Sequence, residues 1–362
     1  MAVDPSSPPD PAADAAAPRQ PRVRRGWYVL CFSGDLARGG HLVRTLFGTP
    51  VVVFRGEDGA VGALVDRCPH RNVPLSAGQV VGGELACGYH GWRFEPGGRC
   101  THVPALIGEA DHPARRCPSF VVREQQGVVW VWAEPGGQPD HEPFSFRLTD
   151  DPTYTVVTRV LEAAGSVHAV AENALDVPHT AFLHGGLFRV DADRNEIACR
   201  VTRHHDRVAC EYIGEPRPDG LVGRILSPSG GVVTHFDRFY LPSIVEVEYR
   251  IGEENHILVN AALTPMADHQ TMLHAVAAIR ARVPIWLIKP VALRAALHIF
   301  GQDQAILAAQ TENLRRFGDA RFASTELDAL GPHILRLLRQ AERGELDPPD
   351  RPPVVRDFKM QV

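Results

Sequence analysis

The chain contains little cysteine, with seven residues in a length of 362. A small secreted domain held together by disulfides carries a far higher proportion, so this content excludes a disulfide framework. Two of the cysteines fall in one short stretch, and the other five are scattered in the manner of buried, small apolar side chains. We therefore expect a reducing compartment and a cytoplasmic protein.

The sequence also lacks segments that direct a chain to or into a membrane. Residues 1–18 have neither a basic start nor an apolar run, which argues against a secretory signal peptide. They are rich in Pro and Ala, and we expect them to be disordered. The most apolar segment, residues 283–300, is interrupted by charged residues and a proline, so we expect a packed helix and no stable membrane insertion.

Two classes of partner are disfavoured by further absences. The chain carries 38 basic and 43 acidic residues, and a net charge of −5 gives no basic face for nucleic acid. No Gly-x-Gly-x-x-Gly follows a strand pattern, which argues against a nicotinamide or flavin bound by this chain itself.

The chain is long enough for two domains, and 44% hydrophobic residues suffice for their cores. Two hairpin patterns, "VVVFRGEDGAVGALVDRC" and "SFVVREQQGVVWVWAEP", predict a small antiparallel β domain. Later residues predict broken helices over 164–184, a β-rich region over 196–280 and a long helix over 285–317, so the whole is of the α+β class. The predicted division is a disordered tail over 1–25, the β domain over 26–135, a linker over 136–150, an α+β domain over 151–346 and a Pro-rich tail over 347–362.

The stretch "CPHRNVPLSAGQVVGGELACGYHGW" contains two pairs of metal-ligand residues, namely Cys68 with His70 and Cys87 with His90. A zinc ribbon or finger usually opens with two nearby cysteines, whereas each pair here mixes a thiol with an imidazole. Such pairs let both thiolates bind one iron and both imidazoles bind the other, which is the arrangement of a Rieske [2Fe-2S] cluster. Zinc remains the alternative.

This stretch resembles the Rieske domains of the ring-hydroxylating oxygenases, including Arg71 after the first histidine and Gly91-Trp92 after the second. The Rieske proteins of respiratory complexes carry an extra cysteine in each ligand loop, and this sequence does not. The resemblance therefore favours the oxygenase branch, and it implies a helix-grip (START/Bet v 1-like) second domain with a curved antiparallel sheet and a long C-terminal helix.

A second motif, "ENALDVPHTAFLH", contains Asn173, Asp176, His179 and His184. We expect Asp176 and His179 on one face of a helical turn, with His184 one turn further on. Two histidines are two of the ligands in a 2-His-1-carboxylate iron site. Taken alone, the pair is better explained as two unrelated histidines. Beside a Rieske domain, the segment resembles the mononuclear iron motif of the same oxygenases, and Asn173 and Asp176 become candidate catalytic residues.

The resemblance implies that the third iron ligand comes from the long C-terminal helix. Asp303 lies there among apolar residues, where a carboxylate is costly to bury unless it is paired or bound to a metal. Glu312, further along the same helix, is the alternative.

The resemblance further implies a homotrimer, in which the cluster of one subunit approaches the iron of the next. Asp176 would bridge them, accepting hydrogen bonds from its own His179 and from His90 of a neighbouring copy, because a ligating histidine commonly donates its free N–H to a carboxylate.

The sequence thus predicts the oxygenase component of a Rieske non-haem iron system. It would use dioxygen, and electrons from NAD(P)H delivered by a separate reductase and in some systems a ferredoxin, to hydroxylate or dealkylate a small, largely apolar substrate. Three other readings remain: an arene cis-dihydroxylating dioxygenase, an electron-transfer protein, and a zinc-binding regulatory module.

Overall fold

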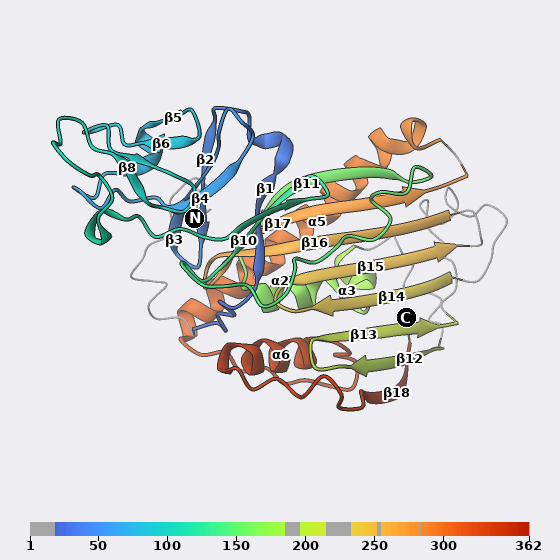
Figure 1. Ribbon diagram of the computed structural model, residues 1–362. Helices are drawn as coiled ribbons and strands as arrows, with labels where there is room; N and C mark the ends of the chain where they lie inside the picture. The colour runs from blue at the N-terminus through green and yellow to red at the C-terminus, as the bar shows by residue number, and fades with distance from the viewer. Residues whose placement is uncertain (1–18, 185–195, 215–232, 252–254, 283, 362) are drawn as a thin grey trace.

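The chain folds into a small β region and a larger region of one sheet with helices, as seen in a computed structural model (Figure 1). The structure describes residues 19–184, 196–214, 233–251, 255–282 and 284–361. The expectation of disorder over residues 1–18 lies outside the described residues. No helix among the described residues is long and apolar enough to cross a membrane.

The first region consists of three small antiparallel sheets. Strand β1 pairs with β10, which pairs with β9, and β2, β3 and β4 form a meander. The third sheet consists of β5 to β8; the connection between its β6 and β7 holds Cys87 and His90, and the connection that leads into it from β4 holds Cys68 and His70. The strands are β1 Trp27–Phe32, β2 His41–Leu46, β3 Thr49–Arg55, β4 Val61–Val65, β5 Gln79–Val81, β6 Glu84–Ala86, β7 Arg93–Phe94, β8 Cys100–His102, β9 Val122–Gln125 and β10 Val128–Trp132, with 3-10 helices at Ser33–Asp35, Leu75–Ala77 and Pro113–Arg115.

The second region is built on one antiparallel sheet of eight strands in the order β11-β17-β16-β15-β14-β13-β12-β18. The strands are β11 Thr155–Ala163, β12 Glu196–Arg203, β13 Arg207–Ile213, β14 Val233–Tyr240, β15 Ile244–Ile251, β16 Asn255–Ala267, β17 Gln270–Arg280 and β18 Val354–Gln361. Strands β12 to β14 show alternating burial, as expected when each face meets a different environment. The β-rich region predicted over residues 196–280 contains strands β12 to β17.

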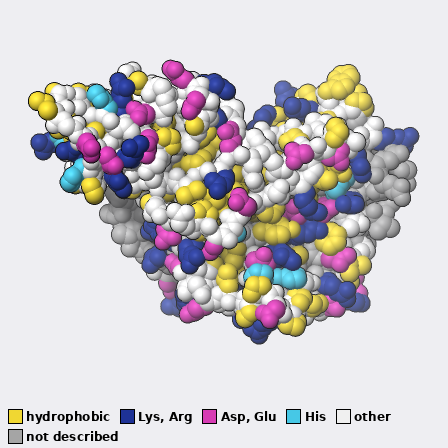
Figure 2. Space-filling view, in the orientation of Figure 1, with side chains coloured by type: hydrophobic (Ala, Val, Ile, Leu, Met, Phe, Trp, Pro, Cys, Tyr) yellow, Lys and Arg dark blue, Asp and Glu magenta, His cyan; other side chains and the backbone are white. Residues whose placement is uncertain are grey.

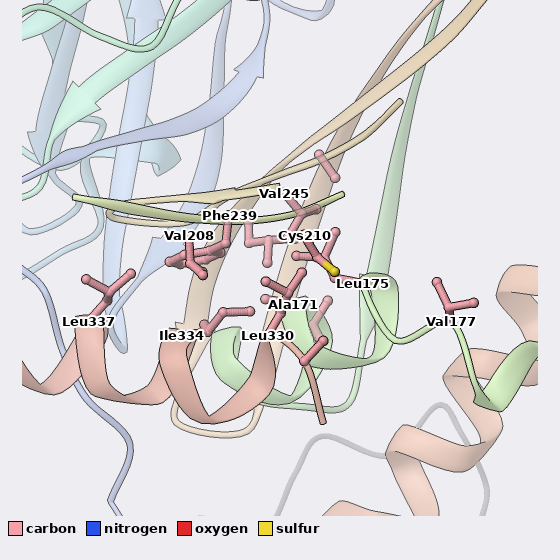
Figure 3. Packing of buried hydrophobic residues seen from close by; sticks show 14 of the residues in the cluster. Ala171, Leu175, Val177, Val208, Cys210, Phe239, Val245, Leu330, Ile334 and Leu337 are labelled. Carbon is pink, nitrogen blue, oxygen red and sulfur yellow. The ribbon is translucent and has the colours of Figure 1, made fainter. Parts of the chain in front are cut away.

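The helices that the described part of the chain places with this sheet are α2 Val167–Ala174, α3 His179–Leu183, α5 Ile285–Phe317 and α6 Gly331–Arg343. Figure 3 shows Ile334 and Leu337 of α6 and Ala171 of α2 pointing toward Val208 and Phe239 on one face of the sheet. All five side chains are buried in a single apolar cluster, which fixes α2 and therefore the segment that follows it. Helix α5 ends at Gly318, whose φ of +70° suits the left-handed turn that closes a helix.

The expected α+β fold, with a β domain followed by an antiparallel sheet and a long C-terminal helix, is confirmed. Two terminal segments contribute more to the fold than the sequence suggested. Within the tail assigned to residues 1–25, Val23 is buried and Arg22 forms an ion pair of 2.9 Å with Asp268. Within the tail assigned to 347–362, β18 pairs along the whole of β12 and forms one edge of the sheet. Charged side chains of both signs are interspersed on the face shown in Figure 2, in keeping with a small net charge.

Candidate metal centres

The two Cys-His pairs lie in two tight connections at one end of the first region. Cys68 and His70 follow β4, and Cys87 and His90 follow β6. Each connection closes on itself, since Cys68 N donates to Val73 O at 2.8 Å and Cys87 N donates to Trp92 O at 2.8 Å. A side chain at Gly88 would not fit, because its Cβ would lie 2.5 Å from a backbone oxygen of the facing connection. Local backbone bonds thus fix all four candidate ligands.

Like donors are grouped in this end of the molecule. Cys68 and Cys87 are both buried, and their thiols are close enough to hydrogen-bond. The rings of His70 and His90 lie 4.6 Å apart between centroids, and His90 is exposed. His70 also stacks on Trp92, and its buried Nδ1 has no hydrogen-bond partner among the described residues. Two thiols on one side and two imidazoles on the other, with an unsatisfied ring nitrogen, fit the donor set of a Rieske cluster.

The environment of these thiols favours a bound metal over a free thiolate. Burial is the main cause that raises the pKa of Cys68, to about 11, and the neighbouring Cys87 adds to it. A coordinating metal removes the proton from a thiol, so bound iron would offset this cost.

A second group of ligand atoms converges where α3 meets the middle of α5. His179 begins α3, His184 directly follows it, and Asp303 lies on α5. The Nε2 atoms of the two histidines are 3.3 Å apart, and they lie 3.6 and 3.2 Å from Oδ1 of Asp303. Among the described residues these three side chains form a group whose ligand atoms all lie within 4.8 Å of one another. Two imidazoles and one carboxylate are the ligand set typical of non-haem Fe(II) oxygenases.

The side chains around this triad hold its members in place. Asp176 Oδ2 accepts from the backbone N of His179 at 3.1 Å and lies 3.2 Å from its Nδ1. On the other side, Nδ1 of His184 lies 2.8 Å from Oε1 of Gln302. Asn173 Nδ2 donates to Oδ1 of Asp303 at 3.4 Å. Both histidines therefore direct Nε2 toward Asp303.

Nearby acids also set the charge of His179. Burial lowers the pKa of its imidazole, but the hydrogen bonds to Asp176 and Asp303 outweigh burial and raise that pKa to about 9. Without a cation, the protonated ring of His179 therefore supplies the positive charge that balances Asp176 and Asp303. A bound metal ion would supply that charge in its place.

The structure brings together the residues named from the second motif and corrects one local detail. Asp176 was expected on a helical turn with His179, but it lies in the connection between α2 and α3. Pro178 accounts for this break, because a proline disfavours helical backbone in the residue before it. Glu312, the alternative ligand, is 60% exposed and lies near Arg316, away from the triad. Gln302 was not anticipated, and its place before Asp303 gave no signal of a contact with His184.

A cavity of about 900 Å³ adjoins the triad, with both Asp176 and His179 in its lining. Its walls come from α2, α3, α5 and the residues that precede α6, and they include the apolar side chains of Phe182, Leu307 and Phe322. The cavity is open to the surface, since Phe182 and Phe322 in its lining are exposed and the side chain of Asp176 is 30% exposed.

Comparisons with known proteins agree with this arrangement of two centres. Residues 26–113 match the family described as Rieske [2Fe-2S] domain. Residues 164–344, half of the chain, match the family described as vanillate O-demethylase oxygenase C-terminal domain. Both candidate centres fall within or beside these matches.

Several of the similar curated proteins are named as oxygenase components or subunits. Dicamba O-demethylase, oxygenase component, of Stenotrophomonas maltophilia is 37% identical over 182 residues, 48% of this chain and 51% of that protein. The 3-chlorobenzoate-3,4-dioxygenase oxygenase subunit of Comamonas testosteroni is 29% identical over 255 residues, 69% of this chain and 58% of that protein. The chain thus spans roughly half the length of curated relatives that it matches.

Solved structures show the same fold. The crystal structure of dicamba monooxygenase bound to 3,6-dichlorosalicylic acid superposes with a TM-score of 0.75 at 24% identity, covering 90% of this chain and 99% of that one. NdmB of Pseudomonas putida CBB5 gives a TM-score of 0.74 at 20% identity, covering 94% and 99%. The chain therefore belongs to the Rieske oxygenase family, with a Rieske [2Fe-2S] domain followed by a catalytic domain of the vanillate O-demethylase type.

Proposed function

We propose that this protein is the oxygenase component of a multicomponent system that hydroxylates or oxidatively dealkylates a small, largely apolar substrate. The observation that carries the proposal is the convergence of His179, His184 and Asp303 in a chain that also contains the two Cys-His pairs. In this assignment Cys68, His70, Cys87 and His90 hold a [2Fe-2S] cluster, and the triad holds one Fe(II). The bound iron supplies a site with open positions where dioxygen is activated.

The side chains of the protein place the two metal centres and bring the cluster close to the surface, where electrons can reach it. The buried thiols and the exposed His90 direct the imidazole side of the cluster toward the surface, where a reductase or ferredoxin can deliver electrons. Asp303 and the two histidines would hold the iron through ligand atoms that all lie within 4.8 Å of one another. The buried part of the adjoining cavity, lined by Leu175, Tyr212 and Leu307, suits an apolar substrate held by a few polar contacts, whereas Phe182 and Phe322 lie at its exposed rim.

Dealkylation is the reaction favoured within this class. The dicamba relative is an O-demethylase, and a relative from Rhizorhabdus wittichii, 28% identical over 62% of this chain, is a chloroacetanilide N-alkylformylase. Hydroxylation of a carbon attached to oxygen or nitrogen gives an unstable product that loses the alkyl group. The chlorobenzoate dioxygenase relative supports ring dihydroxylation as the second candidate.

We also propose that the working unit is a homotrimer in which electrons pass between subunits. The connections that carry Cys68 and Cys87 lie beside β5 to β8, well separated in Figure 1 from α3 of the same chain. We call the end of the first region that contains Cys68, His70, Cys87 and His90 the cluster end. There, Tyr89 and Ile107 are exposed apolar side chains, and Arg71 is an exposed cation.

The surface around Asp176 offers features that complement the cluster end. Phe182 and Phe322 are exposed at the rim of the cavity there, beside the acids Glu172 and Asp328. Burial is the main cause that raises the pKa of Glu172, to about 7, and Asp328 and Asp176 add to it by repulsion. Exposed apolar side chains on both surfaces, with the cation Arg71 on one and the acid Asp176 on the other, favour docking of one copy on the next. Asp176 would then lie between its own His179 and His90 of the neighbouring copy.

Iron content and product analysis test the proposal together. The purified protein should contain about three iron atoms per chain, two in the cluster and one at the triad. With a surrogate reductase, NAD(P)H and dioxygen, an O-methyl or N-methyl arene should lose its methyl group as formaldehyde. A diol product would favour the dioxygenase, about two irons without turnover would favour an electron carrier, and a colourless zinc protein would overturn the assignment.

A further inference from the structure

The two histidines of the triad are held by chemically different partners. His179 directs its Nδ1 to the carboxylate of Asp176 at 3.2 Å, whereas Nδ1 of His184 lies 2.8 Å from the amide oxygen of Gln302. The environments differ as well. His184 is 2% exposed, while the side chains of His179 and Asp176 are 22% and 30% exposed.

The contact with Gln302 has a direct effect on which nitrogen of His184 can bind a metal. An amide oxygen can only accept a hydrogen bond, so it keeps the proton on Nδ1 of the neutral ring. The lone pair then resides on Nε2, which lies 3.2 Å from Oδ1 of Asp303. Because Gln302 directly precedes Asp303 on α5, one rigid turn carries both the carboxylate ligand and the group that orients the imidazole ligand.

Charge explains why this acceptor is an amide. Fe(II) brings two positive charges, which Asp303 and Asp176 balance. A third carboxylate beside the buried His184 would leave an uncompensated negative charge away from water, and burial of such a charge is costly. The neutral amide of Gln302 on the buried side orients His184 without adding a charge. The carboxylate of Asp176 lies on the more exposed side, where a charge costs less.

We propose that Gln302 is a positioning residue for the mononuclear metal site, fixing the tautomer and the ring orientation of His184. This rests on the proposed iron site. Groups that orient ligating imidazoles in this way typically change metal affinity about 10-fold to 100-fold when removed. Loss of the contact between Gln302 and His184 should therefore weaken metal binding even when no substrate is present and no turnover takes place.

The experiment measures metal binding to the full-length protein after mild chelation has removed the mononuclear metal and left the cluster absorbance unchanged. Co(II) is titrated calorimetrically into the wild type, Gln302→Leu, Gln302→Asn and Gln302→Glu. We expect Gln302→Leu to bind Co(II) about 10-fold to 100-fold more weakly. Gln302→Asn, one methylene shorter, should show a similar loss. Gln302→Glu keeps an acceptor at the same reach, so it should bind Co(II) more tightly than Gln302→Leu, while its additional buried charge lowers the stability of the protein.

Gln304→Leu is the matched control on the same helix. Gln304 hydrogen-bonds to the backbone oxygen of Glu162, so its loss removes a contact of α5 without touching a ligand. Wild-type affinity in Gln302→Leu and Gln302→Asn would overturn the proposal, as would an equal loss in Gln304→Leu. Failure of the wild type to bind one Co(II) per chain would instead reject the metal site itself, and the role of Gln302 with it.

Discussion

Asp303 and Glu312 lie on the same helix, but only one of them meets the two histidines. Asp303 is 15% exposed and accepts a hydrogen bond from Asn173, whereas Glu312 faces solvent beside Arg316. We predict that Asp303→Ala loses about one iron per chain and all turnover while keeping the Rieske spectrum, since two ligands rarely hold Fe(II) where three are needed.

Glu312→Ala serves as the control for that variant and should keep full iron content and activity. Metal analysis and the visible spectrum of both proteins check the assignment. The reverse pattern, with iron retained in Asp303→Ala and lost in Glu312→Ala, would mean that the wrong carboxylate has been assigned.

Asp176 allows metal binding to be separated from electron delivery. Asp176→Asn is nearly isosteric, so both centres should keep their iron. The variant loses a charge-assisted hydrogen bond, worth roughly 1.5–3 kcal/mol, that we propose helps to position the cluster of the next subunit. We expect the reduced cluster to be oxidised at least about 10-fold more slowly in a single turnover with substrate and dioxygen. A wild-type rate in this variant would remove Asp176 from the electron path.

At the scale of single elements, β15 carries a buried charge cluster that ties the linker to the sheet. Glu246 and Glu248 are both buried, and each forms ion pairs with Arg147 of the linker and Arg238 of β14, at 2.7 to 3.1 Å. Two neighbouring carboxylates need two cations, and the linker supplies one of them. The cluster thereby fixes the path of the chain between the two domains.

This cluster gives stability a defined dependence on pH. Burial alone would raise the pKa of Glu248, but hydrogen bonds from Arg238 and Arg147 outweigh it and lower the pKa to about 2. The stabilising contribution is therefore present above the ordinary value near 4.5 and is lost as the pH falls toward 2. We predict that Glu248→Gln is less stable than wild type by about 1–3 kcal/mol at pH 7.

Urea unfolding at neutral and at acid pH measures this effect. The difference between wild type and Glu248→Gln should shrink as the pH is lowered through that window, because protonation removes the same charge from the wild type. Glu326→Gln, at an exposed position, should track the wild type throughout. A difference that is constant with pH would show that the charge of Glu248 is not the cause.

At the scale of the whole molecule, electron transfer between subunits can be tested by mixing two inactive variants. Cys87→Ser should lack the cluster and Asp303→Ala should lack the iron, so neither works alone. In co-assembled oligomers, a cluster from one chain can meet an iron from the next at about a quarter of the interfaces, by random pairing in a symmetric ring. We expect turnover to return to roughly that fraction of wild type. If each cluster serves its own chain, mixing restores none.

Much of the chemistry follows from sequence alone, because metal-ligand spacing within a loop or a helical turn is a local property. Cys68 with His70, and Cys87 with His90, are adjacent along the chain, and their connections close on themselves by backbone bonds. The long helix over residues 285–317 was also predicted from the sequence, because its apolar pattern is a local feature. Asp176 and His179 were paired correctly for the same reason, although the residue before Pro178 is not helical.

Tertiary structure decided what depends on long-range packing. Nothing in the spacing of Asp303 and Glu312 determines which one faces the histidines; the packing of α5 against the segment after α2 does. The contact of Gln302 with His184 joins residues 118 positions apart. Strand β18, which forms one edge of the sheet, comes from the segment predicted only as a Pro-rich tail. The sequence by itself determined which candidate ligands are available, because local spacing encodes them. Only the fold decided which of them meet, because burial against distant elements selects one face of each helix.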